Sequence, residues 1–226
     1  MKKLEKKIGI SFKDKDLLKT AFVHKSYVNE HRKESVTDNE RLEFLGDAVL
    51  ELVSTKHLFE KCPDKSEGEM TSFRSALVKG KTLAEIAEEL DLGEYLFLSR
   101  GEEQSGGREK NYILANTLEA LIGTIYLDQG YGAAEKFIEK FILARLDEII
   151  EKGLHIDAKS RFQEACQEIL EVTPHYEIVK EEGPDHEKEF TMGAYIGEEL
   201  VATGMGSSKQ KAEDEAAKNA LKTKGW

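Results

Sequence analysis

The segment Ile113–Leu127 constrains the fold of this chain more than any other part of the sequence. Its residues are almost entirely apolar, so a helix formed by them carries apolar side chains on every side and must be buried. No apolar run in the chain approaches the roughly 20 residues that a membrane span needs. We therefore expect a protein without a membrane partner, in which other elements surround this helix.

The rest of the first 150 residues predicts amphipathic helices that can cover the buried one. Apolar residues recur at helical spacing, and polar or glycine-containing breaks separate the periodic stretches. We expect loops at residues 29–38 and 101–107, and a turn at Cys62-Pro63-Asp64. The predicted helices cover residues 12–23, 42–58, 70–78, 82–90 and 133–150.

The pattern changes near Gly153, where a second type of structure begins. Asp157 can cap a helix with Phe162 on its apolar face, and Pro174 ends that helix. A last helix carries alanines along one side. Three short β-like runs lie between the two helices, at residues 176–180, 190–196 and 200–204, with turns at 183–185 and 197–199. The order α-β-β-β-α predicts a small second domain at 157–226, after a mainly α-helical first domain at 3–152 whose core ends near residue 131.

Acidic residues gather on one face of the predicted helix 42–58 and the residues just before it. Carboxylates four residues apart repel each other unless a positive charge lies between them, and few lysines or arginines share this face. The face is either a solvated acidic stripe or one wall of a cation site. At 100° per residue, four acids fall within a sector of about 80°. The opposite side is apolar and carries Leu42, Leu45, Val49 and Leu52. The four acids are Glu40, Glu43, Asp47 and Glu51.

Two oxygen-bearing side chains interrupt the apolar segment. Asn116 and Glu119 are three residues apart, on the same side of a helix. A carboxylate in so apolar a helix is costly unless it is paired, hydrogen-bonded or bound to a metal. Arg74 could neutralise Glu119. Alternatively, oxygen ligands from two helices could hold a hard divalent cation such as Mg²⁺.

Charge and cysteine content bear on the partners and the compartment. The formal net charge is −11, which on its own speaks against a nucleic-acid partner, so any RNA-binding surface must depend on where particular cations lie. The two cysteines form no CxxC or Cys/His pattern, which argues against a zinc site or a disulfide framework. We expect a protein of the reducing cytoplasm.

The stretch Glu40-Arg41-Leu42-Glu43-Phe44-Leu45-Gly46-Asp47-Ala48 resembles the signature of the ribonuclease III family. The resemblance covers almost the whole chain and includes Ser105-Gly106-Gly107 and Leu118-Glu119-Ala120-Leu121-Ile122-Gly123. The part after residue 157 resembles a double-stranded-RNA-binding domain, through Gly183-Pro184-Asp185-His186 and Gly204-Met205-Gly206-Ser207-Ser208-Lys209. An all-helical endonuclease domain followed by this α-β-β-β-α domain is the fold that the resemblance implies.

The resemblance implies a homodimeric, Mg²⁺-dependent enzyme, with Mn²⁺ as a possible substitute, that cuts double-stranded RNA. Its products carry 5′-phosphate and 3′-hydroxyl ends, and ribosomal RNA precursors and some messenger and transfer RNA transcripts are the expected substrates. Glu43, Asn116 and Glu119 match metal ligands of the family, and Asp47 and Glu119 match its catalytic pair. Phe44 matches an aromatic residue that inserts into the partner subunit. The alternative for Phe44 is that its own subunit covers it. Glu40 and Glu67 match acidic positions near the cleft.

The small domain carries side chains suited to A-form RNA, which is recognised through 2′-hydroxyls in the minor groove and through phosphates. The RNA-binding candidates are Gln163, Glu164, His186, Ser208, Lys209 and Lys211. Asn116 lies where the family usually has aspartate, so an alternative remains open: a double-stranded-RNA-binding regulator with weak or absent cleavage. A helical dimer whose acids are merely solvated is a third interpretation.

Overall fold

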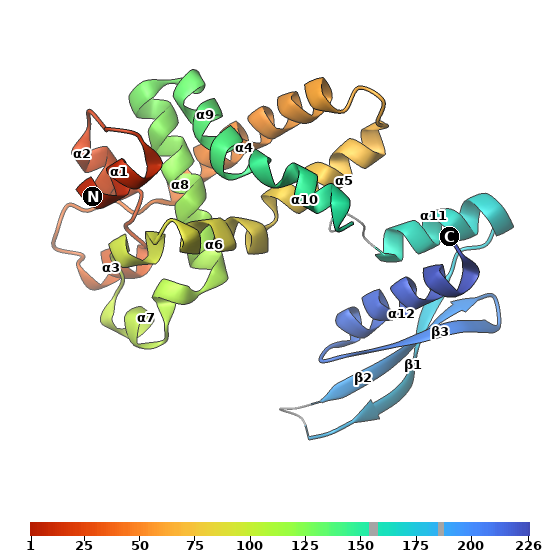
Figure 1. Cartoon of the computed structure of the whole chain (residues 1–226). Helices are drawn as coiled ribbons and strands as arrows, with labels where there is room; N and C mark the ends of the chain where they lie inside the picture. Colours follow the sequence, from red (N-terminus) through yellow and green to blue (C-terminus); the bar gives the residue numbers. More distant parts are fainter. Residues whose placement is uncertain (154–157, 185–187) are drawn as a thin grey trace. The chain divides into compact units, whose positions relative to one another are not determined.

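A computed structural model of the chain describes residues 1–153, 158–184 and 188–226. The chain divides into two compact units, Met1–His155 and Ile156–Trp226. The first unit is helical and the second combines helices with a small sheet (Figure 1). The predicted fold class, a helical domain followed by an α-β-β-β-α domain, is confirmed. None of the described helices is long and apolar enough to cross a membrane.

The first unit is built around α8, the helix predicted from the apolar segment. It spans Asn111–Gln129 and packs against α4, α6 and α9. Eleven of its residues are buried, as expected of a helix that is apolar on most sides. The unit's α-helices are α1 (Lys2–Ile8), α2 (Lys15–Thr20), α3 (Lys25–Glu30), α4 (Glu40–Lys61), α5 (Glu67–Val78), α6 (Gly80–Glu89), α7 (Arg100–Gln104), α8, α9 (Tyr131–Phe141) and α10 (Leu146–Glu151).

Several predicted elements of this unit are wrong in extent. The single helix expected over 133–150 is broken after Phe141 by a 3₁₀ turn, Leu143–Arg145. The loop expected at 101–107 overlaps α7, which covers residues 100–104. The helix expected over 12–23 is shorter because Asp14 caps α2 by accepting hydrogen bonds from the N–H groups of Asp16 and Leu17. Leu52, expected on the apolar side of α4, is 58% exposed.

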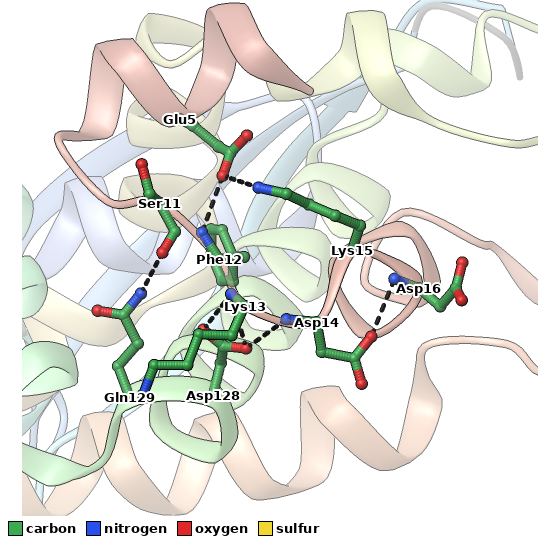
Figure 2. Close-up of polar contacts among 9 residues, drawn as sticks. All are labelled: Glu5, Ser11, Phe12, Lys13, Asp14, Lys15, Asp16, Asp128 and Gln129. Carbon is green, nitrogen blue, oxygen red and sulfur yellow. Dashed lines mark hydrogen bonds and ion pairs between the residues drawn. The ribbon is translucent and has the colours of Figure 1, made fainter.

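The N-terminal residues, for which no helix was predicted, are fixed to the end of α8 (Figure 2). The Asp128 carboxylate accepts hydrogen bonds from the N–H groups of Lys13 and Asp14, at 3.0 and 2.8 Å. The buried Glu5 accepts hydrogen bonds from the N–H of Phe12 and from the ammonium of Lys15. These contacts join α1, α2 and α8 into one body.

The second unit is an antiparallel sheet with two helices. The sheet has the order β1-β2-β3. The helix α12 packs on β2 and β3, and α11 packs on α12. Gly204 allows the close approach of α12, since a Cβ there would lie 2.1 Å from the backbone nitrogen of Ala216. The elements are α11 (Ala158–Leu170), β1 (His175–Glu182), β2 (Glu189–Ile196), β3 (Glu199–Gly206) and α12 (Lys209–Lys224).

The three predicted strands are all present, and each is longer than the apolar pattern indicated. Several of the added end residues are acidic residues that complete the sheet pairing, such as Glu182 opposite Glu189. Two irregularities interrupt the register, one in β1 between Ile178 and Lys180 and one in β3, where Val201 is the extra residue opposite Ala194 and Tyr195 of β2. The predicted cap Asp157 and the end of the turn at 183–185 lie outside the described residues.

Candidate active site

Two glycines allow α4 and α8 to cross at close range. A Cβ on Gly46 would lie 1.8 Å from the carbonyl oxygen of Glu119, and a Cβ on Gly123 would lie 2.3 Å from the carbonyl oxygen of Leu42. Any larger residue at either position would force the two backbones apart. Because a glycine inside a helix destabilises it by roughly 1 kcal/mol relative to alanine, such glycines mark places where close approach is required.

The crossing brings the candidate acids of the two helices together. Glu43 and Asp47 come from α4, and Asn116 and Glu119 come from α8. Glu43 and Glu119 are partly buried, whereas Asp47 is exposed. Side chains that are about 70 residues apart in the sequence therefore share one small region, as the two-helix cation site requires.

The acids at the crossing are electrostatically strained. Burial, followed by the charges of Asp47 and Glu43, raises the pKa of Glu119 to about 7. The pKa of Glu43 is also raised, first by burial and then by the charges of Glu40 and Asp47, while a side-chain interaction with Asn116 opposes the rise. Each carboxylate thus makes ionisation of the next one harder.

The donor set at the crossing fits a hard divalent cation. It consists of three carboxylates, which repel one another, and one amide oxygen, and these are the ligand types that Mg²⁺ prefers. A cation among them would offset the repulsion that raises the pKa of Glu119. Within the described residues, no three His, Cys, Asp or Glu side chains are already gathered closely enough to hold a metal ion.

The alternative in which Arg74 neutralises Glu119 is wrong. The Arg74 guanidinium instead forms an ion pair with Glu51, at 3.1 Å, and donates a hydrogen bond to Thr55 Oγ1, at 2.8 Å. Its charge is not among the influences on the Glu119 pKa. Glu119 therefore keeps its unfavourable environment without compensation from Arg74.

The two remaining acidic candidates are placed differently. Glu40, the first residue of α4, forms a 3.0 Å ion pair with Lys25, a residue that no sequence pattern singled out. Glu67 lies at the start of α5, where it lines a cavity of about 220 Å³ with Phe59 and Arg74. Phe59 is 12 residues beyond Asp47 on α4, about 18 Å along the helix, so one copy of the chain does not bring Glu67 to the crossing.

Phe44 is 80% exposed, which contradicts the alternative that its own subunit covers it. It borders a cavity that α2 and the end of α8 also line, through Leu17, Thr20 and Leu127. Leu127 is itself 54% exposed. A large aromatic side chain beside an apolar hollow is typical of a surface that another molecule covers.

The described RNA-binding candidates lie in the middle of α11 and at the start of α12. Gln163 and Glu164 are exposed near the middle of α11. Ser208 caps α12 by accepting a hydrogen bond from the N–H of Lys211. The Lys211 ammonium donates to Ser207 Oγ at 3.1 Å, and Lys209 lies over the ring of Phe190, with Nζ 5.8 Å from its centroid. His186 lies outside the described residues.

Sequence reasoning missed three residues that shape the site. Gly46 and Gly123 carried a usable signal, because glycine inside a strongly predicted helix indicates close backbone approach. Lys25 carried none, because it precedes α4 by fifteen residues and belongs to no periodic pattern. Only the fold places it beside Glu40.

Comparison with known proteins extends these observations. The family described as Ribonuclease-III-like matches residues 14–146, and the Double-stranded RNA binding motif matches residues 158–224. A protein of Chloroflexus aurantiacus named Ribonuclease 3 is 47% identical over 220 residues, covering 96% of this chain and 89% of that protein. The Ribonuclease 3 of Enterococcus faecalis is 45% identical over 220 residues, covering 97% and 95%.

A solved structure agrees with the first unit. The crystal structure of the nuclease domain of ribonuclease III from Campylobacter jejuni is 43% identical, has a TM-score of 0.59, and covers 64% of this chain and 95% of that domain. The family match takes in both acidic helices, and the second match takes in the whole sheet with its helices. The chain therefore belongs to the ribonuclease III family and joins a ribonuclease-III-like domain to a double-stranded-RNA-binding motif.

Proposed function

We propose that the chain is an endoribonuclease that hydrolyses double-stranded RNA at the α4–α8 crossing. The observation that carries this proposal is Glu119, a carboxylate on the buried helix whose pKa burial, Asp47 and Glu43 raise to about 7. Strongly perturbed acids of this kind are typical of catalytic sites. Membership of the ribonuclease III family supports the same activity.

Each residue at the crossing has a proposed role. Glu43 and Glu119 hold the divalent cation, with the Asn116 side-chain oxygen as a third donor. Asp47 positions the attacking water and forms the catalytic pair with Glu119. A bound Mg²⁺, or Mn²⁺ in its place, would acidify water and shield the charge of the phosphate and the leaving oxygen. Hydrolysis leaves 5′-phosphate and 3′-hydroxyl ends.

The proposed active form is a homodimer. Phe44 is exposed beside the cavity that Leu17 and Leu127 line, and a second copy could cover this surface. A related nuclease domain, that of Campylobacter jejuni ribonuclease III, shows structural flexibility in a region involved in dimer formation, and its dimer supports the proposal. Two-fold symmetry would then supply two acidic sites, one for each RNA strand, and leave a short 3′ overhang.

The second domain is proposed to deliver the duplex to these sites. Gln163 and Glu164 reach 2′-hydroxyls from α11, His186 enters a second minor groove, and Ser208 with Lys209 and Lys211 contacts phosphate at the start of α12. We place the nuclease domain at 3–152 and the RNA-binding domain at 157–226. The proposed substrates are ribosomal RNA precursors and some messenger and transfer RNA transcripts. The proposed location is the cytoplasm, because Cys62 and Cys166 form no disulfide and suit its reducing conditions.

A gel assay on a long RNA duplex tests the proposal. The purified chain should cut the duplex in the presence of Mg²⁺ and stop when EDTA removes the metal, while a DNA duplex of the same sequence stays intact. Absence of cutting at every Mg²⁺ and Mn²⁺ concentration, with the duplex still bound, would favour the alternative of an RNA-binding regulator.

In this proposal, the identity of residue 116 affects the Mg²⁺ concentration at which cleavage is half-maximal. An amide oxygen is a ligand without negative charge, so the cation loses one Coulombic partner relative to aspartate. Asn116→Asp should lower the Mg²⁺ concentration at half-maximal cleavage, and Asn116→Ala should raise it. RNA binding measured without metal should barely change in either variant. A shared midpoint for all three proteins would show that residue 116 is not a ligand.

A further inference from the structure

We infer that Lys25 binds a phosphate of the cleaved RNA strand beside the acidic site. This inference rests on the proposed function. The observation behind it is the position of the Lys25 ammonium, 3.0 Å from the Glu40 carboxylate at the first turn of the helix that carries Glu43 and Asp47. Among the described residues, Lys25 forms no ion pair with any of the proposed metal ligands.

A cation supplied by the protein would add to the proposed Mg²⁺ in attracting RNA to the acidic site. Four carboxylates lie at or next to the crossing, and RNA brings further negative charge, so a bare site would repel its substrate. Among the described residues, Lys25 is the only lysine or arginine with an ion pair to any of these four acids, which are Glu40, Glu43, Asp47 and Glu119.

The backbone that carries Lys25 is held firmly in place. The N–H of His24 donates to the carbonyl of Phe97 at 3.1 Å, and the N–H of Ser99 donates to Ser26 Oγ at 3.1 Å. At the other end of α3, the Glu30 carboxylate accepts a hydrogen bond from the N–H of Arg100 at 2.9 Å. Both ends of the six-residue helix are therefore tied to residues 97–100, and these contacts fix the backbone position of Lys25.

Glu40 holds the lysine only loosely. The side chains of Lys25 and Glu40 are 60% and 54% exposed, and an ion pair so open to water contributes little to stability. Exchange of the Glu40 carboxylate for an RNA phosphodiester therefore costs little, because the phosphodiester also presents one negative charge shared by two free oxygens. In this arrangement Glu40 keeps Lys25 next to the site until the RNA arrives.

A salt titration of cleavage tests the inference. The experiment measures kcat/KM on one RNA duplex over a range of salt concentrations and takes the slope of log(kcat/KM) against log[salt]. It compares four proteins: the full-length chain, Lys25→Gln, Lys25→Arg and the control Lys3→Gln. Lys3 is the matched control because it forms a similarly exposed 3.2 Å ion pair with Glu94, away from the site. Lys25→Gln should lower kcat/KM about tenfold and make the log–log salt slope shallower by about one per site. Lys25→Arg and Lys3→Gln should keep the parent slope.

Glu40→Gln separates phosphate binding from a purely structural role. If Lys25 binds phosphate, Lys25→Gln has the same or a larger effect in the Glu40→Gln background. If Lys25 acts only by holding Glu40, Lys25→Gln has no effect in that background, and the inference is wrong. An unchanged salt slope in Lys25→Gln, or an equal change in Lys3→Gln, also overturns it. Failure of the parent itself to cut RNA would instead overturn the proposed function.

Discussion

At the scale of single residues, Glu119 is the side chain that distinguishes a reactive site from a solvated acidic stripe. It projects from a helix with eleven buried residues, and neither Arg74 nor another described cation appears among the causes of its pKa shift. Burial and two neighbouring carboxylates keep its pKa near 7 instead of in the usual acidic range. The fold therefore retains Glu119 at a cost in stability, which is expected when a residue is kept for function.

This cost can be measured through its pH dependence. Because the folded state raises the Glu119 pKa, the folded state binds this proton more tightly, and its stability falls as pH rises from about 4.5 to about 7. In EDTA at pH 8, Glu119→Gln should increase the free energy of unfolding by on the order of 1–3 kcal/mol, with no gain at pH 4. Urea unfolding at both pH values checks this, with the exposed Glu67→Gln as control. Equal gains at pH 4 and pH 8 would contradict the assignment.

At the scale of elements, the α4–α8 crossing positions the acids. The Gly46 position leaves no room for a Cβ against the Glu119 carbonyl, 1.8 Å away. Gly46→Ala should lower the free energy of unfolding by about 3 kcal/mol and abolish cleavage, because it separates the two acidic helices. Gly132→Ala in α9 is the control: a Cβ there meets nothing within 4 Å, so this helix should gain up to about 1 kcal/mol. Thermal unfolding and the duplex assay report both effects.

The accuracy of sequence-based prediction also differed between elements. The buried helix around Ile113–Leu127 and the α-β-β-β-α order were predicted because their hydrophobic patterns are long or follow one another in a diagnostic order. The break after Phe141 was not predicted, because the apolar spacing continues through it although the α-helix ends there. Leu52 was assigned to the core by periodicity alone; Leu42 and Val49 on the same side of α4 are buried, but Leu52 is 58% exposed. Lys25 joined the site only through tertiary structure.

At the scale of the whole molecule, our proposal assigns catalysis to the first unit and most RNA binding to the second. The first unit carries the acidic crossing, and the second carries Ser208, Lys209 and Lys211 at the start of α12. A chain ending at Gly153 should fold and dimerise, yet bind duplex RNA much more weakly at physiological salt. Because the second domain offers few phosphate contacts, the slope of the logarithm of its RNA-binding constant against the logarithm of the salt concentration should be about −2 to −4. Filter binding measures the RNA affinity of the full-length and the shortened chain at several salt concentrations. Equal affinity of the two chains would place the RNA-binding surface outside the second domain.

The central claim, that the carboxylates at the α4–α8 crossing perform the hydrolysis while other surfaces bind the RNA, has one direct test. Cleavage rate and duplex affinity are measured side by side for the full-length chain, Asp47→Asn and Glu119→Gln, with Lys65→Gln as a surface control. We expect both site variants to lose at least about 100-fold in cleavage rate while keeping their affinity for the duplex within about threefold. Cleavage near the parent rate by either variant would contradict the claim.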